Sequence, residues 1–309
     1  MNIKTYGVIV TYKPDIIVLE DCINSIKMQL NKIIIVDNTP KADKNLEIFK
    51  NYSSIDIIHL GDNYGIAYAQ NVGIKKALEE NAEFILLSDQ DTTYPTNFIN
   101  DMLSCFNEEN IAAAGPLFKD NHTNNIQFFI KKGCLGFKKI YPQNGKHEVL
   151  QLIASGTVLN AKYLKDIGLM REDLFIDWVD MEWCWRAIKK GYKIIGNADI
   201  LINHTLGDRL INIKFKHIIY RKPTRNYYIT RNAVYCSIYI DSLDIIHRVN
   251  LFVRSLTYIA KFSIFMPPHL KNLKYTMKGF YHGLIGEIGR LNEITRPLNN
   301  SPFLCCRIF

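Results

Sequence analysis

Four short apolar runs, separated by longer amphipathic or polar segments, restrict the fold of this chain more than any other feature. The runs occupy residues 7–10, 32–36, 55–60 and 84–87. Short runs in which apolar residues predominate in this way are typical of strands that are buried on both faces of a sheet. Helical patterns such as 16–30 and 65–80 lie between them, which indicates parallel strands joined by helical crossovers. The pattern predicts an α/β fold.

Two carboxylates follow the fourth apolar run directly, in the sequence Ser88-Asp89-Gln90-Asp91. The carboxyl ends of parallel strands form the edge at which α/β folds bind their ligands. Hard divalent cations such as Mg²⁺ or Mn²⁺ bind one or two carboxylates together with substrate phosphates and waters. Asp89 and Asp91 therefore predict a metal site for a nucleotide diphosphate.

Other nucleotide-binding sites are excluded by the motifs that the chain lacks. No G-x-G-x-x-G follows the first run, and no G-x-x-x-x-G-K-[ST] occurs anywhere in the sequence. Asp37 ends the second run and leaves two alternatives open. It can accept a hydrogen bond from a pyrimidine N–H, or it can belong to an ordinary strand-ending turn with Asn38, Thr39 and Pro40.

The strand-end motifs around Thr11, Asp37 and Asp89, together with later motifs in the chain, resemble in content and order those of the inverting glycosyltransferases of family 2. Members of that family have the GT-A fold. Within that family the chain is most similar to bacterial rhamnosyltransferases that use dTDP-L-rhamnose to build O-antigens and capsules. The resemblance covers roughly residues 5–235 and rests on residues 10–12, 36–38, 63–73, 88–91 and 177–186, with 204–208 and 225–232 typical of the subgroup. It implies a GT-A domain with a mixed, mainly parallel sheet, followed by a mainly helical C-terminal region.

The resemblance also implies which residues bind the donor and the metal. A divalent ion, Mg²⁺ or Mn²⁺, is expected on Asp89, Asp91 and His204, although a lone histidine can equally be structural. The residues expected to bind the nucleotide sugar are Thr11, Tyr12, Asp37, Asn63, Gly65, Asn71, Asp89, Arg225, Tyr228 and Arg231.

The segment that contains Asp177, Asp180 and Glu182 is expected to carry the chemistry. Inversion at an anomeric carbon is a single displacement, which needs a general base for the acceptor hydroxyl. By resemblance the base is Asp180, the second acid of the family's Glu-Asp pair. Val179 stands where the first acid is common, so Asp177 and Glu182 are reserve candidates. A helix starting near Trp178 would make Asp177 its N-cap and place Asp180 on the same face.

Two glycines and two tryptophans in these motifs have structural interpretations. Gly65 is expected to permit a positive φ or a close backbone approach, at a helix start whose N–H groups favour an anion. Gly73 is interpreted as a site of close helix–sheet packing. Trp183 and Trp185 are expected to be packing residues rather than sugar-stacking platforms.

Charge divides the chain unevenly. Residues 1–204 carry 22 Lys and Arg against 25 Asp and Glu, whereas residues 205–309 carry 16 against 5. We therefore expect a catalytic domain over residues 1–210 and a basic, mainly helical region over 211–309. Basic amphipathic helices suit an anionic membrane surface, although a helical subdomain with a solvated positive face explains the pattern equally well.

The expected partners are dTDP-L-rhamnose and a lipid-linked saccharide acceptor, at the inner face of the cell membrane. Seven scattered cysteines and the absence of a signal peptide indicate the cytoplasm. A UDP-hexose donor in the same fold is the alternative. A nucleic-acid-binding protein is disfavoured because the motif-bearing half is acidic. Residues 119–146 are expected to form a mobile loop over the acceptor site.

Overall fold

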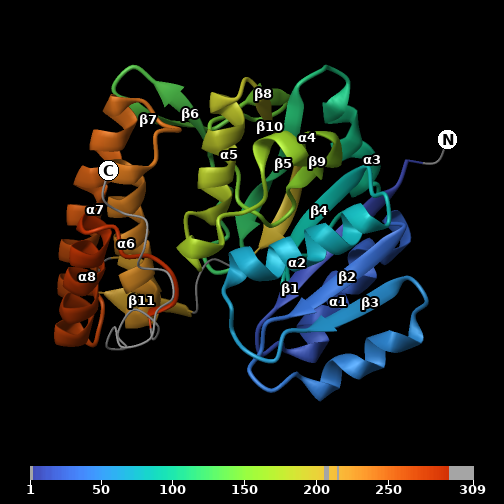
Figure 1. Cartoon of the computed structure of the whole chain (residues 1–309), viewed down its shortest axis with the longest axis horizontal. Coiled ribbons are helices and arrows are strands. Elements are labelled where there is room, and N and C mark those ends of the chain that lie inside the picture. Colours follow the sequence, from blue (N-terminus) through green and yellow to red (C-terminus); the bar gives the residue numbers. More distant parts are fainter. Residues whose placement is uncertain (1–2, 205–208, 214–215, 292–309) are drawn as a thin grey trace, which may run out of the picture.

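The computed structural model describes residues 3–204, 209–213 and 216–291. Its centre is an eight-stranded sheet with the strand order β3-β2-β1-β4-β9-β5-β10-β8 (Figure 1). The first four strands are parallel to one another, as predicted. They are β1 (Thr5–Thr11), β2 (Lys32–Asp37), β3 (Ile55–His59) and β4 (Phe84–Asp89).

The crossovers between these strands follow the sequence pattern with one exception. Helix α1 (Ile16–Ile26), extended by the 3₁₀ turn η1 (Lys27–Gln29), joins β1 to β2, and α2 (Ile66–Glu79) joins β3 to β4. Only a short 3₁₀ helix, η2 (Lys44–Asn51), lies between β2 and β3.

The second half makes the sheet mixed. Strands β5 (Ile111–Asp120) and β10 (Lys193–His204) pair in parallel. The short β9 (Val158–Asn160) runs antiparallel between β4 and β5, and β8 (Lys146–Glu148) closes the edge antiparallel to β10. The mixed, mainly parallel sheet expected from the resemblance is therefore present.

Helices cover both faces of the sheet, and alternate strand residues supply the two cores. Val8 and Val10 face a core shared with α2, α4 (Ala161–Ile167) and α5 (Val179–Lys189). Ile9 faces the other core, which contains α1, α3 (Phe98–Leu103) and part of the 3₁₀ turn η3 (Ser104–Phe106). This alternation explains why the strands are apolar throughout.

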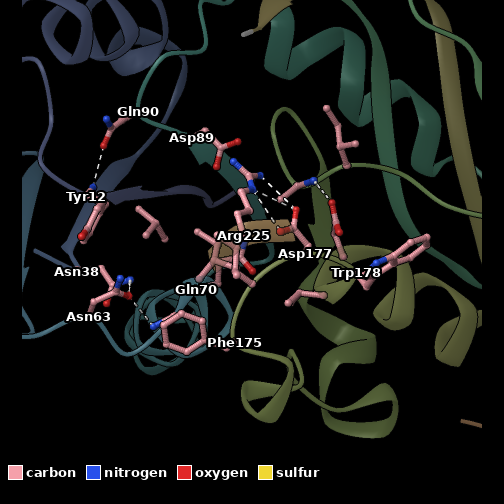
Figure 2. A pocket seen from close by; sticks show the side chains of 18 of the residues that line it. Tyr12, Asn38, Asn63, Gln70, Asp89, Gln90, Phe175, Asp177, Trp178 and Arg225 are labelled. Carbon is pink, nitrogen blue, oxygen red and sulfur yellow. Dashed lines mark hydrogen bonds and ion pairs between the residues drawn. The ribbon is translucent and has the colours of Figure 1, made fainter. Parts of the chain in front are cut away.

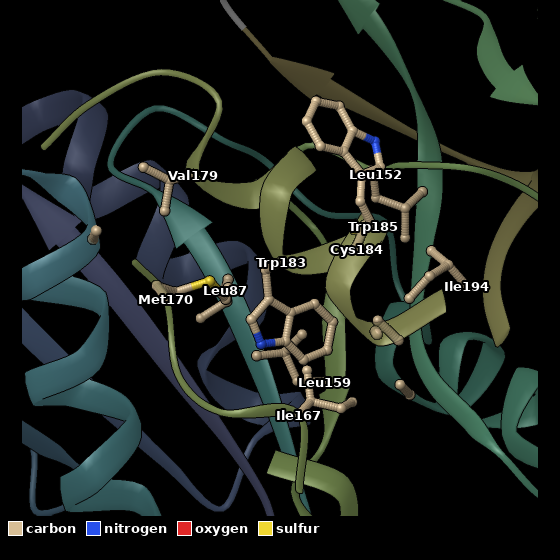
Figure 3. Close-up of a cluster of buried hydrophobic side chains, with 14 of the residues drawn as sticks. Leu87, Leu152, Leu159, Ile167, Met170, Val179, Trp183, Cys184, Trp185 and Ile194 are labelled. Carbon is tan, nitrogen blue, oxygen red and sulfur yellow. The ribbon is translucent and has the colours of Figure 1, made fainter. Parts of the chain in front are cut away.

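The packing interpretations are confirmed. Trp183 and Trp185 on α5 are buried in the core (Figure 3), and their indole N–H groups donate to the Gly168 carbonyl and to Gln151 Oε1. A Cβ at Gly73 would lie 2.3 Å from Val8 Cγ1, so only glycine lets α2 lie this close to β1.

The C-terminal part is mainly helical, with α6 (Pro223–Tyr239), α7 (Ile245–Phe265) and α8 (His269–Leu284) packed on one another. The hairpin of β11 (Arg209–Ile213) and β12 (Lys216–Tyr220) precedes them, so the expected boundary at residue 210 falls inside a strand. Among the described residues, no helix combines the length and apolar character that crossing a membrane requires.

The segment 119–146 differs from the expected mobile loop. It continues β5 and then forms a hairpin of β6 (Phe129–Gly133) and β7 (Gly136–Ile140). Asn250 Nδ2 on α7 donates to the Leu135 carbonyl at 3.1 Å and ties the hairpin to the helical region. Because the hairpin packs on α7 and does not line the cleft described below, the loop prediction is corrected.

Candidate active site

A cleft of about 560 Å³ opens at the carboxyl ends of β1 and β4 (Figure 2). The first turn of α2, the segment 175–181 and the start of α6 complete its walls. Predicted site residues that line it are Tyr12, Asn63, Gly65, Asp89, Asp91, Asp177, Asp180, His204 and Arg225. The cleft therefore joins the predicted metal ligands, the predicted base and part of the predicted donor site.

Asp89, Asp91 and His204 form a cluster with the composition of a cation site. One ligand atom from each lies within 4.8 Å of the other two. His204 Nε2 is 3.8 Å from Asp89 Oδ2, and His204 Nδ1 is 3.5 Å from Asp91 Oδ1. Two partly exposed carboxylates and a buried imidazole fit a divalent ion that keeps positions for phosphate and water.

Burial and the neighbouring carboxylates of Asp91 and Asp89 affect the pKa of His204. Burial lowers the pKa of His204, but the carboxylates of Asp91 and Asp89 outweigh burial and hold the pKa above its ordinary value. Two acids that attract a proton onto a buried imidazole would also attract a cation. The position of His204 in this cluster is compatible with a metal ligand, and that role stays a prediction.

Asp180 lies in the same cleft and is held by two backbone donors. Its Oδ2 accepts from the Ala154 N–H at 3.0 Å and its Oδ1 from the Met181 N–H at 3.0 Å. Burial raises the pKa of Asp180 to about 6; the negative charge of Asp89 acts in the same direction, and the hydrogen bonds oppose both only in part. A carboxylate with this pKa is suited to accept a proton near neutral pH.

The turn 153–157 connects Asp180 to the acid cluster. Ala154 holds Asp180, and the neighbouring Ser155 donates its hydroxyl to Asp89 Oδ2 at 2.5 Å. The turn is fixed to β4, because the Gly156 N–H donates to the Leu87 carbonyl. No sequence motif indicated Ser155.

The capping interpretation of Asp177 is wrong. The N-cap of α5 is Trp178, which has φ 69° and makes no side-chain cap. Asp177, with φ 62°, instead forms an ion pair with Arg225, whose Nη2 lies 3.2 Å from Asp177 Oδ1 (Figure 2). Phe175, Asp177 and Trp178 all have positive φ without being glycine, so the cleft wall is a strained segment held by its contacts.

Glu182 is removed from the reserve candidates by its position. Its side chain is 2% exposed and does not line the cleft. Both oxygens accept from Arg186 at 3.0 Å, and Arg186 also donates to the carbonyls of Ile167 and Leu169. Glu182 therefore anchors α5 to the chain after α4.

Amide side chains organise the predicted donor side of the cleft. The Tyr12 N–H donates to Gln90 Oε1 at 2.8 Å, and Asn38 Nδ2 donates to Asn63 Oδ1 at 3.1 Å (Figure 2). Asn63 Oδ1 also accepts from the Gly65 N–H, which fixes the approach to α2. Asn38 and Gln90 were not predicted, although both lie beside predicted residues.

Gly65 has the predicted positive φ, 90°, and its close neighbour is the protein itself. A Cβ there would lie 2.5 Å from the Phe175 carbonyl oxygen, and that oxygen accepts from the Ile66 N–H at 2.8 Å. The first N–H of α2 is thus bound to the chain and not open to an anion.

Replacing Gly65 with alanine is expected to destabilise the protein more than the same change at Gly61. Gly61 has φ 77°, and a Cβ added there would have nothing within 4 Å, so Gly61→Ala measures backbone strain alone, about 1–2 kcal/mol. Gly65→Ala adds overlap with Phe175, which costs about 1–3 kcal/mol more. Urea unfolding measures the free energy of unfolding of both variants. Equal losses of stability would contradict the predicted overlap with Phe175.

Two predicted donor-binding residues lie at the sheet edge but outside the cleft lining. Thr11 is fully buried on β1. Asp37 is fully buried too; its carboxylate accepts from the N–H groups of Thr39 and Asp43, and His59 Nδ1 lies 2.9 Å from it. Burial alone would raise the pKa of Asp37, but these hydrogen bonds hold it below its ordinary value. Of the two alternatives for Asp37, the turn is the one that this geometry fits.

Three further predicted residues stabilise the walls from behind and do not line the cleft. Asn71 exchanges hydrogen bonds with the backbone of Met170. Tyr228 stacks on Phe175 at 4.9 Å between ring centroids. Arg231 is fully buried and donates to the Leu174 and Gly289 carbonyls. These three predictions are corrected to structural roles.

Two further polar lining residues, Gln70 and Arg221, were not predicted. Gln70 is 4% exposed, and among the described residues its Oε1 has no hydrogen-bond partner. It offers a buried acceptor to a ligand in the cleft (Figure 2). Arg221, just after β12, adds a second arginine to the wall that contains Arg225. Gln70 lies within the predicted 63–73 motif, whereas nothing in the sequence singled out Arg221.

Comparisons with known proteins agree with this arrangement. A family model for glycosyl transferase family 2 matches residues 8–168. The dTDP-rhamnosyl transferase RfbF of Shigella flexneri is 38% identical over 241 residues, which are 75% of this chain and 79% of the relative.

Solved structures with the same fold include two that contain nucleotide ligands. GalNAc-T7 with UDP, GalNAc and Mn²⁺ superposes with a TM-score of 0.58 at 14% identity, over 82% of this chain and 55% of that one. Residues 1–349 of S. aureus TarS in complex with UDP-GlcNAc give a TM-score of 0.58 at 17% identity, over 91% and 82%. At these identities the similarity concerns the fold alone.

Proposed function

This chain belongs to glycosyltransferase family 2, and from that premise we propose that it is a rhamnosyltransferase that uses dTDP-L-rhamnose. The acceptor in this proposal is a lipid-linked saccharide of cell-surface polysaccharide synthesis, reached from the cytoplasm at an anionic membrane surface. The 38% identity to a dTDP-rhamnosyl transferase is the observation that carries the choice of donor. The metal cluster and Asp180 in one cleft support the reaction type.

The proposed reaction is a single displacement with inversion at the anomeric carbon. Asp180 takes the proton of the acceptor hydroxyl while the acceptor oxygen bonds to that carbon and the bond to the diphosphate breaks. Asp89, Asp91 and His204 would hold a divalent ion, which would supply positive charge to the diphosphate leaving group. Ala154 holds Asp180 and Ser155 holds Asp89, so one turn keeps the base and the diphosphate end of the cleft in register.

Arg225 is proposed to contribute to donor binding from the α6 side of the cleft. Its side chain is 36% exposed and is oriented by Asp177. A planar guanidinium held in this way can present donors to a phosphate. On the opposite wall, Tyr12 and Asn63 are the predicted donor-binding residues whose position in the cleft supports a contact.

A donor panel tests the proposal. The purified chain is incubated with dTDP-L-rhamnose, UDP-glucose or UDP-GlcNAc, with and without Mn²⁺, and its melting temperature and nucleotide release are measured. We expect the largest stabilisation and turnover with dTDP-L-rhamnose and Mn²⁺. A preference for a UDP-hexose would contradict the proposed donor but would leave the proposed reaction type unchanged. Binding to random duplex DNA without response to any nucleotide sugar would reject the proposal.

A further inference from the structure

The two outer helices of the C-terminal region each expose an apolar stripe. Figure 1 shows α7 and α8 on the side of α6 that faces away from the sheet. The exposed apolar side chains recur at intervals of three or four residues, or of eight between Leu256 and Ile264, so each set lies on one helix face. They are Ile245, Val249, Val253, Leu256 and Ile264 on α7, and Leu270, Leu273, Met277, Tyr281 and Leu284 on α8.

The two stripes belong to neighbouring helices. The rings of Phe252 on α7 and Phe280 on α8 are 5.8 Å apart, and the two helices pack on each other. Isolated apolar side chains are normal on protein surfaces, whereas a contiguous apolar surface over two helices indicates an interaction site.

The charge of this surface has one sign. Residues 245–284 contain no Asp or Glu and six Lys or Arg. On α8, Lys271, Lys274 and Lys278 each follow a stripe residue by one position, so the cations flank the apolar stripe. Lysines placed in this way can bury their aliphatic stems and keep the ammonium group in a polar layer.

The β6–β7 hairpin extends the same surface. Leu135 at its tip is 88% exposed and lies beside α7, because its carbonyl accepts from Asn250 Nδ2. Lys132 pairs with Asp244 just before α7, at 2.7 Å. Residues 129–140, which form this hairpin, include four lysines and no Asp or Glu. The hairpin therefore adds an exposed apolar tip and further positive charge.

We propose that the docking face, made of the α7 and α8 stripes and the hairpin tip, seats on a lipid bilayer with anionic headgroups. Apolar side chains flanked by lysines match the boundary between acyl chains and anionic headgroups. A second copy of this chain fits less well, because a symmetric contact would bring the lysines of two α8 helices together. The proposal deepens the proposed function and rests on it only for the presence of a lipid-linked acceptor.

The docking face also gives the cleft a defined place relative to the bilayer. Arg221 and Arg225 line the cleft at the start of α6, and α7 and α8 pack on that helix. Two helix layers span roughly 20 Å. A docked chain thus holds its cleft close above the headgroups, within reach of a saccharide that projects from a lipid.

Sedimentation with vesicles tests the docking face without donor or acceptor. The full chain is mixed with phosphatidylcholine vesicles, with or without one quarter phosphatidylglycerol, at low and high salt. We expect at least tenfold stronger binding to the anionic vesicles, lost as salt screens the charges. Equal binding to both vesicle types, or none to either, would overturn the proposal.

Matched variants locate the surface. Leu135→Ser with Ile264→Ser and Leu270→Ser should weaken vesicle binding at least tenfold, because three of the most exposed docking-face residues lose apolar area. Ile17→Ser with Met28→Ser changes residues of similar exposure elsewhere and should leave binding unchanged. Lys271→Gln with Lys274→Gln should lower the preference for anionic vesicles, with Lys41→Gln and Lys44→Gln as the control.

Two outcomes separate this proposal from its alternatives. If the triple serine variant binds vesicles like the unchanged chain, or if it only dissolves a dimer seen by light scattering, the docking face is not a membrane site. Vesicle binding needs no nucleotide sugar, so a chain that sediments with vesicles but fails the donor panel contradicts the proposed function alone.

Discussion

Asparagine in place of Asp180 is expected to lower the transfer rate by about 10²–10⁴-fold while donor affinity stays nearly unchanged. The change removes the proton acceptor from the cleft but leaves the acid cluster and the walls in place. Single-turnover transfer from dTDP-L-rhamnose measures the rate, and calorimetry of dTDP binding measures the affinity. A variant that keeps its rate would show that another group takes the proton.

The pH profile gives the same prediction a second measurement. A base must be deprotonated to work, and the pKa of Asp180 is raised to about 6. The kcat/KM of the unchanged chain should therefore fall about tenfold per pH unit below this value and level off above it. In Asp180→Asn this acid limb should disappear from the residual activity.

The Asp180→Asn variant needs a stability control, because the Asp180 side chain also makes structural hydrogen bonds. The two oxygens of Asp180 each accept one backbone N–H, from Ala154 and from Met181. An asparagine amide has one oxygen, so one hydrogen bond is lost, at a cost of about 1 kcal/mol. Urea unfolding separates this cost from the rate effect.

Asp177→Asn and Glu182→Gln serve as comparison variants. Asp177→Asn should weaken the contact with Arg225 and lower the rate less than Asp180→Asn, because Asn cannot form the ion pair but keeps the shape. Glu182→Gln should lower stability without changing the rate of the folded protein, since Glu182 pairs with Arg186 outside the cleft. If Asp177→Asn or Glu182→Gln lowered the rate more than Asp180→Asn, the assignment of the base to Asp180 would be wrong.

Asparagine in place of Asp91 is expected to abolish metal-enhanced nucleotide binding and to reduce turnover below detection. Asp91 supplies one of the two carboxylates in the Asp89–Asp91–His204 cluster. Because a hard divalent cation is held mainly by charged oxygen ligands, the loss of one of two carboxylates should greatly weaken its binding. Titration of dTDP with and without Mn²⁺ measures the metal effect, and nucleotide release measures turnover. Asp101→Asn, an exposed position on α3, is the matched control.

Chelation provides the contrary test of the metal site. The unchanged chain should lose turnover in EDTA and recover it when Mn²⁺ or Mg²⁺ is restored. Full activity of Asp91→Asn in the presence of the chelator would mean that the cluster has another role.

The first half of the fold could be predicted because its signals are local. Strands β1 to β4, helices α1 and α2 and the packing role of Gly73 follow from apolar runs, periodicity and one small residue. The cluster of Asp89 and Asp91 followed from a motif at a strand end. His204 joins them because β10 pairs with β5 on the same sheet edge, which the resemblance anticipated.

The remainder depends on contacts that no short pattern encodes. Strand β9 has three residues and pairs antiparallel with both β4 and β5, so its direction is set by the surrounding sheet. Asp177 and Trp178 adopt positive φ although neither is a glycine, so the sequence carries no signal for this backbone conformation. Arg231 looked like a phosphate ligand, but burial commits its guanidinium to carbonyl oxygens from two distant segments.

The contact between Gly65 and Phe175 has a consequence for the order in which the protein becomes competent. The two residues are about 110 positions apart, and contacts over such separations require a large loop to close during folding. A growing chain that ends before Phe175 can hold β1 to β4 and both carboxylates, yet it lacks one wall of the donor site. The same segment delivers Asp180 to the cleft. The wall at Phe175 and the proposed base Asp180 therefore reach the cleft with the same segment of the chain.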